Sequence, residues 1–320
     1  MSETTAAKRP PQPDFSAVTA EELIAYRAAE NGWRASSAAR ALLGEPDPSA
    51  AIEWKAVALP GRVLPVRVYR PLSTGGDEAA ARSDLPLVIH VHGGGFVGTA
   101  VQCDWTNSRL AARLPALVVS VEHRLLAPGT ALSAAADDGW DMLRHVLRHA
   151  AQWGIDPSRT VVFGESCGAL ISALTAIRAQ AAGLELTAQV LVNPVVDVTG
   201  TMFDHPSITE YGYSPTRALP LLRLFQQLAV PPGYDAGAVS PLYADDLSGL
   251  APALVVVPTQ DAVADHGRRY AERLRKAGTS VRLSEYPEAQ HAFLTLPGVE
   301  PQAEAAQAEI LTFLRAALSK

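Results

Sequence analysis

The chain has 320 residues, of which 48% are hydrophobic and 19% are charged, a composition ordinary for a folded globular protein. This length accommodates one large α/β domain with a few additional helices. The formal net charge of −6, without any basic run or stripe, argues against nucleic acid as a partner because nothing would neutralise a phosphate backbone.

The N-terminal residues contain no apolar segment of the kind found in secretory signals, and no window approaches the roughly 18 apolar residues that a membrane-spanning helix needs. We therefore expect no membrane span and a cytoplasmic location. The only two cysteines, Cys103 and Cys167, are expected to be free thiols rather than a structural disulfide.

Apolar runs rich in β-branched residues alternate with longer helical patterns, which predicts a mostly parallel sheet with helices on both faces after an initial hairpin. Residues 1–50 do not fit this alternation, and we expect a tail with cap helices there. Residues 51–320 are expected to form the α/β domain, with a cap insertion at about 198–230. The first fourteen residues are expected to be unstructured and residues 73–84 to form an exposed loop. The expected strands lie near residues 63–70, 87–91, 117–122, 160–163, 188–192, 253–258 and 280–286.

Three consecutive glycines, Gly93, Gly94 and Gly95, follow the expected strand at 87–91. Glycines leave a backbone without side chains that would block a substrate oxygen, so amides in this segment can point into a site. Such amides stabilise the oxyanion that forms when an acyl group is attacked, and losing one donor typically slows turnover by roughly 10²–10³-fold. The segment therefore predicts an oxyanion hole.

Residues 164–168 have the pattern Gly-x-Ser-x-Gly directly after the expected strand at 160–163 and before a helix-forming segment. Small residues around a serine permit a strained strand-to-helix turn, called a nucleophile elbow, which exposes the hydroxyl at a helix N-terminus. Ser166 is therefore the candidate nucleophile, and the amide of Cys167 is a further donor to the oxyanion. Because Gly-rich turns match this pattern by chance, the interpretation depends on partner residues.

Both partners that such a serine needs follow later in the chain. Asp261 comes after the expected strand at 253–258, and His291 comes after the strand at 280–286. Loops at the carboxyl edge of a parallel sheet are where open α/β proteins place their ligands. The order Ser, Asp, His is that of the α/β-hydrolase triad and differs from the orders of the two serine protease folds.

Each partner has a competitor in the sequence. Asp265 lies near Asp261 but is placed to cap or solvate the following helix. His266 and His205 are the nearest alternatives to His291, which we favour because it lies in the last loop before the C-terminal helix.

Taken together, these segments resemble the hormone-sensitive-lipase-like family of α/β-hydrolase esterases. The resemblance runs from about residue 50 to the C-terminus and rests on residues 92–96 and 164–168 with Asp261 and His291. It implies an α/β-hydrolase fold with a mostly parallel eight-stranded sheet and a helical cap. It also implies a serine carboxylesterase that hydrolyses short- to medium-chain esters, or an acetylated small metabolite, through an acyl-enzyme on Ser166. No metal and no organic cofactor is implied.

The sequence departs from the family pattern near the candidate site. The family usually has Asp and Ala on either side of the serine, where this chain has Glu165 and Cys167, and His291 is followed by Ala292 where glycine is usual. These departures leave open a reaction other than hydrolysis on the same scaffold, such as acyl transfer or dehydration.

Two other classes of protein also have to be considered. Residues 93–98 match the dinucleotide-binding pattern Gly-x-Gly-x-x-Gly, and Glu122 ends the next strand as a ribose-binding acid would. An NAD-dependent oxidoreductase is therefore a rival, although residues 99–104 do not open a helix directly after the third glycine. A ligand receptor on a hydrolase scaffold is a second rival, against which the presence of His291 argues.

The substrate is expected to be a small-molecule ester, and a homodimer stays open. Apolar side chains in the expected cap and near the glycine segment are candidates to line the substrate pocket, although they fit a cap core equally well. They are Trp33, Trp105, Phe203, Tyr211, Tyr213, Leu221 and Phe225.

Overall fold

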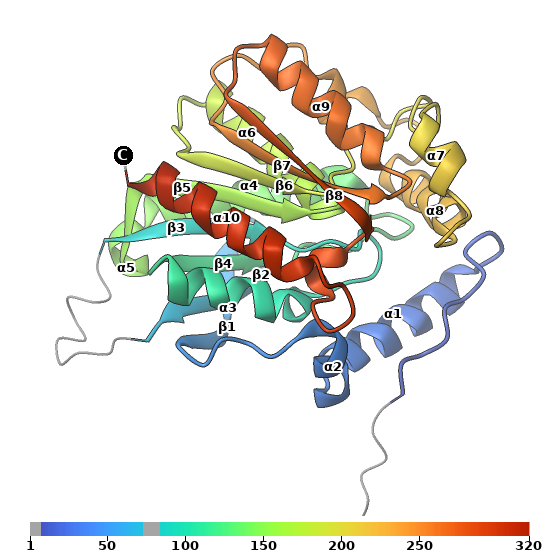
Figure 1. Ribbon diagram of the computed structural model, residues 1–320, viewed down its shortest axis with the longest axis horizontal. Coiled ribbons are helices and arrows are strands. Elements are labelled where there is room, and N and C mark those ends of the chain that lie inside the picture. The colour runs from blue at the N-terminus through green and yellow to red at the C-terminus, as the bar shows by residue number, and fades with distance from the viewer. Residues whose placement is uncertain (1–7, 73–83, 320) are drawn as a thin grey trace, which may run out of the picture.

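The computed structural model describes residues 8–72 and 84–319. Within this part of the chain, eight strands form one sheet in the order β1-β2-β4-β3-β5-β6-β7-β8 (Figure 1). Strand β2 runs antiparallel to both β1 and β4, and the remaining neighbours run parallel. The strands are β1 (Ala50–Leu59), β2 (Arg62–Pro71), β3 (Leu85–Val91), β4 (Leu117–Val121), β5 (Ile155–Glu165), β6 (Ala188–Val192), β7 (Ala253–Gln260) and β8 (Val281–Gln290).

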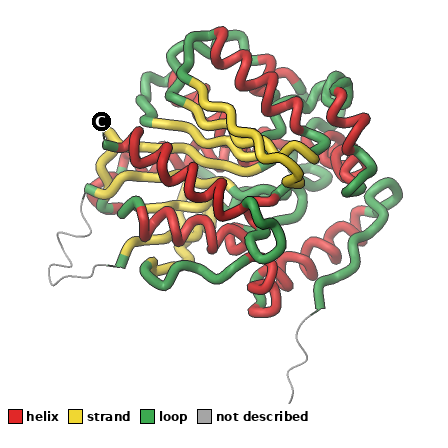
Figure 2. Tube along the Cα trace, viewed as in Figure 1, coloured by secondary structure: helices red, strands yellow, loops and turns green. Residues whose placement is uncertain are grey.

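The central strands are covered on both faces. Strands β3, β4 and β6 are buried along their whole length and consist mainly of Val, Leu and Ile, as expected for parallel strands between two helical layers. One apolar core joins the sheet to α3 and α10, and the other joins it to α4, α6 and α9, so that helices flank the sheet (Figure 2). The flanking helices are α3 (Asp104–Arg113), α4 (Leu132–Arg148), α5 (Ala150–Trp153), α6 (Cys167–Ala181), α9 (Ala264–Lys276) and α10 (Ala303–Leu318).

Four helices outside this alternation lie at the end of the sheet toward which the parallel strands run (Figure 1). Two come from the N-terminal part of the chain, and two come from the segment between β6 and β7. The first of them begins at a capping box, in which Thr19 and Glu22 each accept a hydrogen bond from the other's amide. The four are α1 (Ala20–Arg34), α2 (Arg40–Leu43), α7 (Pro206–Tyr211) and α8 (Ala218–Ala229); short 3₁₀ turns cover Ser37–Ala39, Ala100–Cys103, Gly237–Val239, Pro241–Tyr243 and Phe293–Thr295.

Seven of the strands coincide with runs expected from the sequence, although β5 begins earlier, at Ile155. The first strand, β1, has no counterpart among those runs. It is an edge strand that pairs only with β2, and most of its side chains, including Trp54 and Lys55, are exposed. An exposed edge strand needs no continuous apolar run, so the apolar pattern that identifies the other strands is missing here.

The expected unstructured tail and exposed loop fall partly outside the described residues, which exclude residues 1–7 and 73–83. The tail expectation does not hold for Arg9. Its Nη2 lies 2.8 Å from Oε1 of the fully buried Glu30, and its guanidinium lies over the ring of Trp33. A buried carboxylate needs charged partners, and Glu30 pairs with Arg9 as well as with Arg34 on its own helix, so it holds the chain at Arg9. None of the helices in the described ranges is long and apolar enough to cross a membrane.

Candidate active site

Ser166 occupies the tight turn between β5 and α6. Its φ of 55° and ψ of −118° are strained values for a residue other than glycine, of the kind found at functional turns. A Cβ on Gly164 would lie 2.1 Å from the carbonyl oxygen of Gly168, so only glycine permits the strand and the helix to approach this closely. The Gly-x-Ser-x-Gly segment thus has the geometry of a nucleophile elbow.

A hydrogen-bonded chain of three side chains begins at this serine. His291 Nε2 lies 2.9 Å from Ser166 Oγ, and His291 Nδ1 lies 2.8 Å from Asp261 Oδ2. Because a carboxylate accepts, Nδ1 carries the proton and Nε2 accepts from the serine hydroxyl. Asp261 follows β7, is buried, and accepts the Val263 amide through Oδ1. The structure therefore brings together the three side chains selected from the sequence.

The electrostatics of His291 suit a base. Burial disfavours the charged imidazole, but the charge of Asp261 and its hydrogen bond outweigh this effect and raise the pKa of His291 above its ordinary value. The same carboxylate would stabilise the imidazolium that forms when the serine proton is transferred.

The competing residues have other partners. Asp265 on α9 accepts a hydrogen bond from the amide of Ser207 on α7, and this contact ties the two helices together. Asp265 also binds Arg268. His266 is fully buried on α9, where its Nε2 lies 3.0 Å from the carbonyl oxygen of Met202. Burial lowers the pKa of His266 to about 4, so it is neutral at pH 7. Both residues stabilise the packing of α9 against its surroundings.

Glu165 precedes the serine and lies in the wall of the same site. Its side chain is buried, burial raises its pKa to about 7, and its Oε1 has no hydrogen-bond partner within the described residues. Its charge also raises the pKa of His291, so the two groups are electrostatically coupled. The sequence marks Glu165 only as a departure from the family pattern and gives no sign of this coupling.

The three glycines follow β3 and pack against the elbow, because a Cβ on Gly93 would lie 3.0 Å from the carbonyl oxygen of Glu165. In the part of the chain that the structure describes, the amides of Gly94 and Gly95 donate to no backbone carbonyl. The amide of Cys167 opens α6, where the first amides of a helix lack intrahelical partners. The structure therefore collects amides without a backbone acceptor beside Ser166, and the Gly95 amide has the Cys167 thiol as a weak partner.

Both cysteines are free and buried, as expected. Burial raises the pKa of the Cys167 thiol to about 12, and the neighbouring Gly95 amide only partly opposes this effect. The thiol is therefore protonated at neutral pH and behaves as a small apolar side chain.

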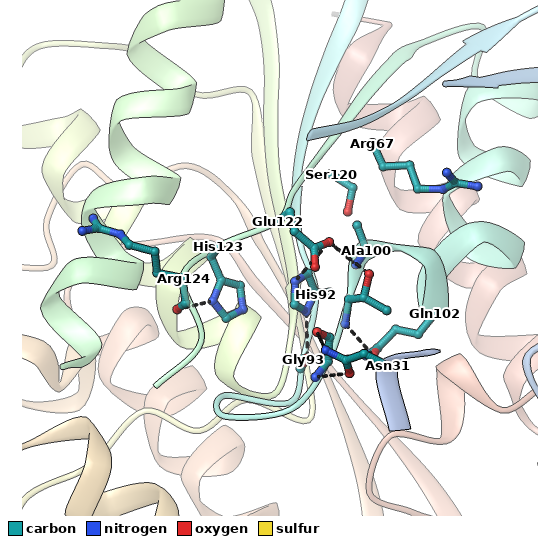
Figure 3. A network of polar contacts seen from close by, with 12 residues as sticks. Asn31, Arg67, His92, Gly93, Ala100, Gln102, Ser120, Glu122, His123 and Arg124 are labelled. Atoms are coloured by element: carbon teal, nitrogen blue, oxygen red, sulfur yellow. Dashed lines mark hydrogen bonds and ion pairs between the residues drawn. The ribbon is translucent and has the colours of Figure 1, made fainter. Parts of the chain in front are cut away.

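Glu122, the acidic residue that completes the resemblance to a dinucleotide site, has a structural role in this fold. Its Oε2 accepts the amide of Ala100 at 2.7 Å and the hydroxyl of Thr99 at 3.1 Å, so this carboxylate caps the turn after the loop (Figure 3). The buried rings of His92 and His123 stack beside it with centroids 4.4 Å apart. Burial lowers the pKa of each ring to about 4, so both are neutral at pH 7.

A cavity of about 370 Å³ opens above Ser166, between the glycine segment and helices α1 and α8. Among the candidate pocket residues, Trp33, Leu221 and Phe225 line it. Sequence reasoning missed further lining residues, three from these helices and one from the turn before α1, although the apolar stripe of α8 is a signal that could have found one of them. These residues are Phe15, Tyr26, Arg34 and Leu222.

Four candidate pocket residues lie outside this lining. Trp105 is buried with α3 in the core beneath α10 and packs against Gly44, where a Cβ would lie 2.5 Å from its ring. Phe203 and Tyr211 pack against the core on the other face of the sheet, and Tyr213 is exposed. Their aromatic character reflects packing or exposure elsewhere in the fold and not the cavity wall. Within the described residues, no group of three or more His, Cys, Asp or Glu side chains could hold a metal ion.

The chain matches a family model described as the alpha/beta hydrolase fold over residues 88–295. It is 35% identical to the carboxylesterase NlhH of Mycobacterium tuberculosis (strain CDC 1551 / Oshkosh) over 99% of both chains. It is 33% identical to the ethyl acetate hydrolase of Pseudomonas putida over 76% of both. Among solved structures it is similar to the hyperthermophilic esterase of the archaeon Pyrobaculum calidifontis, with a TM-score of 0.80 and 29% identity over 92% of this chain and 93% of that one. The chain therefore belongs to the hormone-sensitive-lipase-like esterases of the α/β-hydrolase fold.

Proposed function

We propose that this enzyme is a serine carboxylesterase in which Ser166 is the nucleophile, His291 the general base and Asp261 the residue that orients the base. The observation that carries the proposal is the hydrogen-bonded chain of these three side chains, which starts at a strained elbow and faces the cavity. The esterase names of relatives that align over nearly the whole chain support the same reaction class.

The reaction proceeds in two halves. His291 Nε2 takes the hydroxyl proton as Ser166 Oγ bonds to the ester carbonyl carbon, and the carbonyl π electrons move onto oxygen to give a tetrahedral oxyanion. The oxyanion collapses, the bond to the alcohol oxygen breaks, and His291 returns the proton to that oxygen. Water, deprotonated by the same base, then attacks the acyl-enzyme, and the carboxylic acid leaves as Ser166 regains its proton.

We assign the oxyanion hole to the amides of Gly94, Gly95 and Cys167, with Gly93 as a further candidate. Donors that are already in place need little reorganisation when the negative charge forms, which makes them more effective than water. Cys167 contributes its backbone amide, so the departure from alanine in the family pattern leaves this donor in place.

The cavity favours esters of short or medium acyl chains, because about 370 Å³ lies near the lower end of the range for small-molecule pockets. We infer that the described part of residues 1–50, together with residues 198–230, forms the cap, since α1 and α8 supply apolar walls above Ser166. The acetylated metabolite, the cytoplasmic location and the homodimer stay predictions.

The test compares hydrolysis of p-nitrophenyl acetate and butyrate by the wild type, Ser166→Ala and Ser172→Ala. Ser172 is a matched control because it is a buried serine on α6 whose hydroxyl has no partner within the described residues. Ser166→Ala should lose on the order of 10⁴-fold or more in kcat, and Ser172→Ala should keep wild-type turnover. Wild-type turnover that survives in Ser166→Ala would overturn the assignment.

A further inference from the structure

Three polar side chains on α1 face the glycine loop of residues 93–98. Arg27, Asn31 and Arg34 are spaced i, i+4 and i+7, which places them on one side of the helix. The buried Leu23 and Trp33 hold the helix on the protein. Helix α1 thus presents a polar stripe to the loop that carries the Gly94 and Gly95 amides.

Asn31 makes a two-point contact with the end of this loop (Figure 3). Its Nδ2 donates to the Gly98 carbonyl at 2.8 Å, and its Oδ1 accepts the Gly98 amide at 3.0 Å. Gly98 in turn abuts the first glycine of the loop, because a Cβ on Gly98 would lie 2.5 Å from the Gly93 carbonyl oxygen. Asn31 therefore fixes the point at which the loop closes on itself.

Arg27 holds the middle of the loop. Its Nε donates to the Phe96 carbonyl at 2.6 Å and its Nη2 donates to the Leu126 carbonyl at 2.5 Å. The amide of Leu126 donates to the Gly95 carbonyl at 3.0 Å, so Arg27 joins the loop to a segment that also holds it.

Arg34 completes the stripe through Gln102. The guanidinium donates to Gln102 Oε1, and Gln102 Nε2 lies 3.4 Å from the Gly93 carbonyl oxygen. Residues 93–98 form neither a helix nor a strand, so their conformation depends on contacts of this kind. Much of that support comes from α1, which precedes all the strands in the chain and is separate from the strand ends that carry the candidate catalytic residues.

We propose that Asn31 and Arg27 are positioning residues of the oxyanion hole, through which α1 sets the direction of the Gly94 and Gly95 amides. This inference rests on the proposed esterase function. Neither side chain acts on the reacting atoms directly. Their loss displaces donors that act mainly in the transition state, so it lowers kcat more than it raises KM.

The experiment measures kcat and KM of the full chain with p-nitrophenyl acetate across pH, together with the thermal midpoint. Asn31→Ala removes both hydrogen bonds, and Asn31→Asp keeps the shape while placing a carboxylate against the Gly98 carbonyl. Glu21→Ala is the control, because Glu21 is an exposed residue in the first turn of α1, away from the loop.

Asn31→Ala and Asn31→Asp should each lower kcat by about 10- to 100-fold with KM changed less than about 3-fold, because misplacing catalytic groups by about 1 Å has effects of this size. The acid limb of the pH profile should stay in place, since the triad is untouched, and Glu21→Ala should behave as the wild type. Arg27→Lys, which loses the fork that reaches two carbonyls, should lower kcat in the same manner.

Full activity of Asn31→Asp would overturn the inference, because it would mean that Asn31 acts only through its shape. A lowered thermal midpoint with unchanged kcat in Asn31→Ala would overturn it as well. An inactive wild type would instead refute the proposed function, so the two failures are distinguishable.

Discussion

Phe225 packs directly against Gly95, so closely that a Cβ on this glycine would lie 2.6 Å from the phenyl ring. The contact joins helix α8 to the proposed oxyanion loop. Gly95 also has a φ of 39°, in the left-handed region that side chains disfavour. Position 95 thus requires glycine for two reasons, its backbone conformation and the lack of space for a side chain.

Gly95→Ala should therefore lower kcat by roughly 10²-fold or more, the cost typical of losing one oxyanion donor. Steady-state kinetics with p-nitrophenyl acetate measure this loss. Gly32→Ala is the control, since a Cβ there meets nothing within 4 Å on helix α1. Equal activity of the two variants would contradict the requirement for glycine at position 95.

Phe225→Ala should change the chain-length preference. Removing the ring enlarges the cavity beside Gly95, so kcat/KM for p-nitrophenyl hexanoate should rise relative to that for the acetate. Because Phe225 is buried, the variant should also unfold at a lower temperature. Tyr213→Ala is a suitable control, since this exposed aromatic residue lies outside the cavity lining. An acyl-length profile that matches the wild type would contradict the placement of Phe225 at the substrate.

Asp261→Asn should lower kcat on the order of 10⁴-fold, because an amide in place of the carboxylate favours the wrong imidazole tautomer. Asp265→Asn should keep kcat within about 3-fold, because Asp265 contacts Ser207 and Arg268 rather than the imidazole, and a partly exposed ion pair contributes little. Circular dichroism checks that both variants fold. If Asp265→Asn were the inactive one, the assignment of the acidic residue would be wrong.

Glu165→Gln should shift the pH dependence of kcat. His291 acts as a base only when neutral, so activity rises as pH increases through the His291 pKa. The Glu165 charge raises that pKa, and Glu165 itself titrates at about 7. Removing the charge lowers the His291 pKa, so the acid limb should move to lower pH. Glu285→Gln, an exposed control on β8 that pairs with Arg268, should leave the limb in place. An unmoved limb in Glu165→Gln would show that the two groups are not coupled.

Sequence patterns predict the elements that the core requires. The strands that precede Ser166 and Asp261 contain apolar runs at residues 161–163 and 253–258, and the ends of these runs locate the candidate site. The structure also gives a reason for one departure from the family pattern. Ala292 has a φ of 63°, a conformation that the usual glycine adopts without strain. The family preference at this position thus follows from the backbone rather than from the chemistry of the side chain.

What the sequence could not predict is which surface each helix meets. The aromatic residues Trp105 and Tyr213 suit a pocket by composition, yet one is core and the other is exposed. The spacing of Arg27, Asn31 and Arg34 is visible in the sequence, but it indicates only one face of a helix. That this face meets the glycine loop depends on contacts between segments nearly 70 residues apart. Such long-range contacts leave no local signal.

The most direct test of the central claim is the intact mass of the enzyme after reaction with a fluorophosphonate, followed by peptide mapping. The account predicts one adduct, on Ser166, that forms rapidly in the wild type and is absent in Ser166→Ala. It also predicts that His291→Ala slows labelling strongly, because the hydroxyl then lacks its base at 2.9 Å. An adduct on any other residue, or equal labelling of Ser166→Ala, would contradict the account.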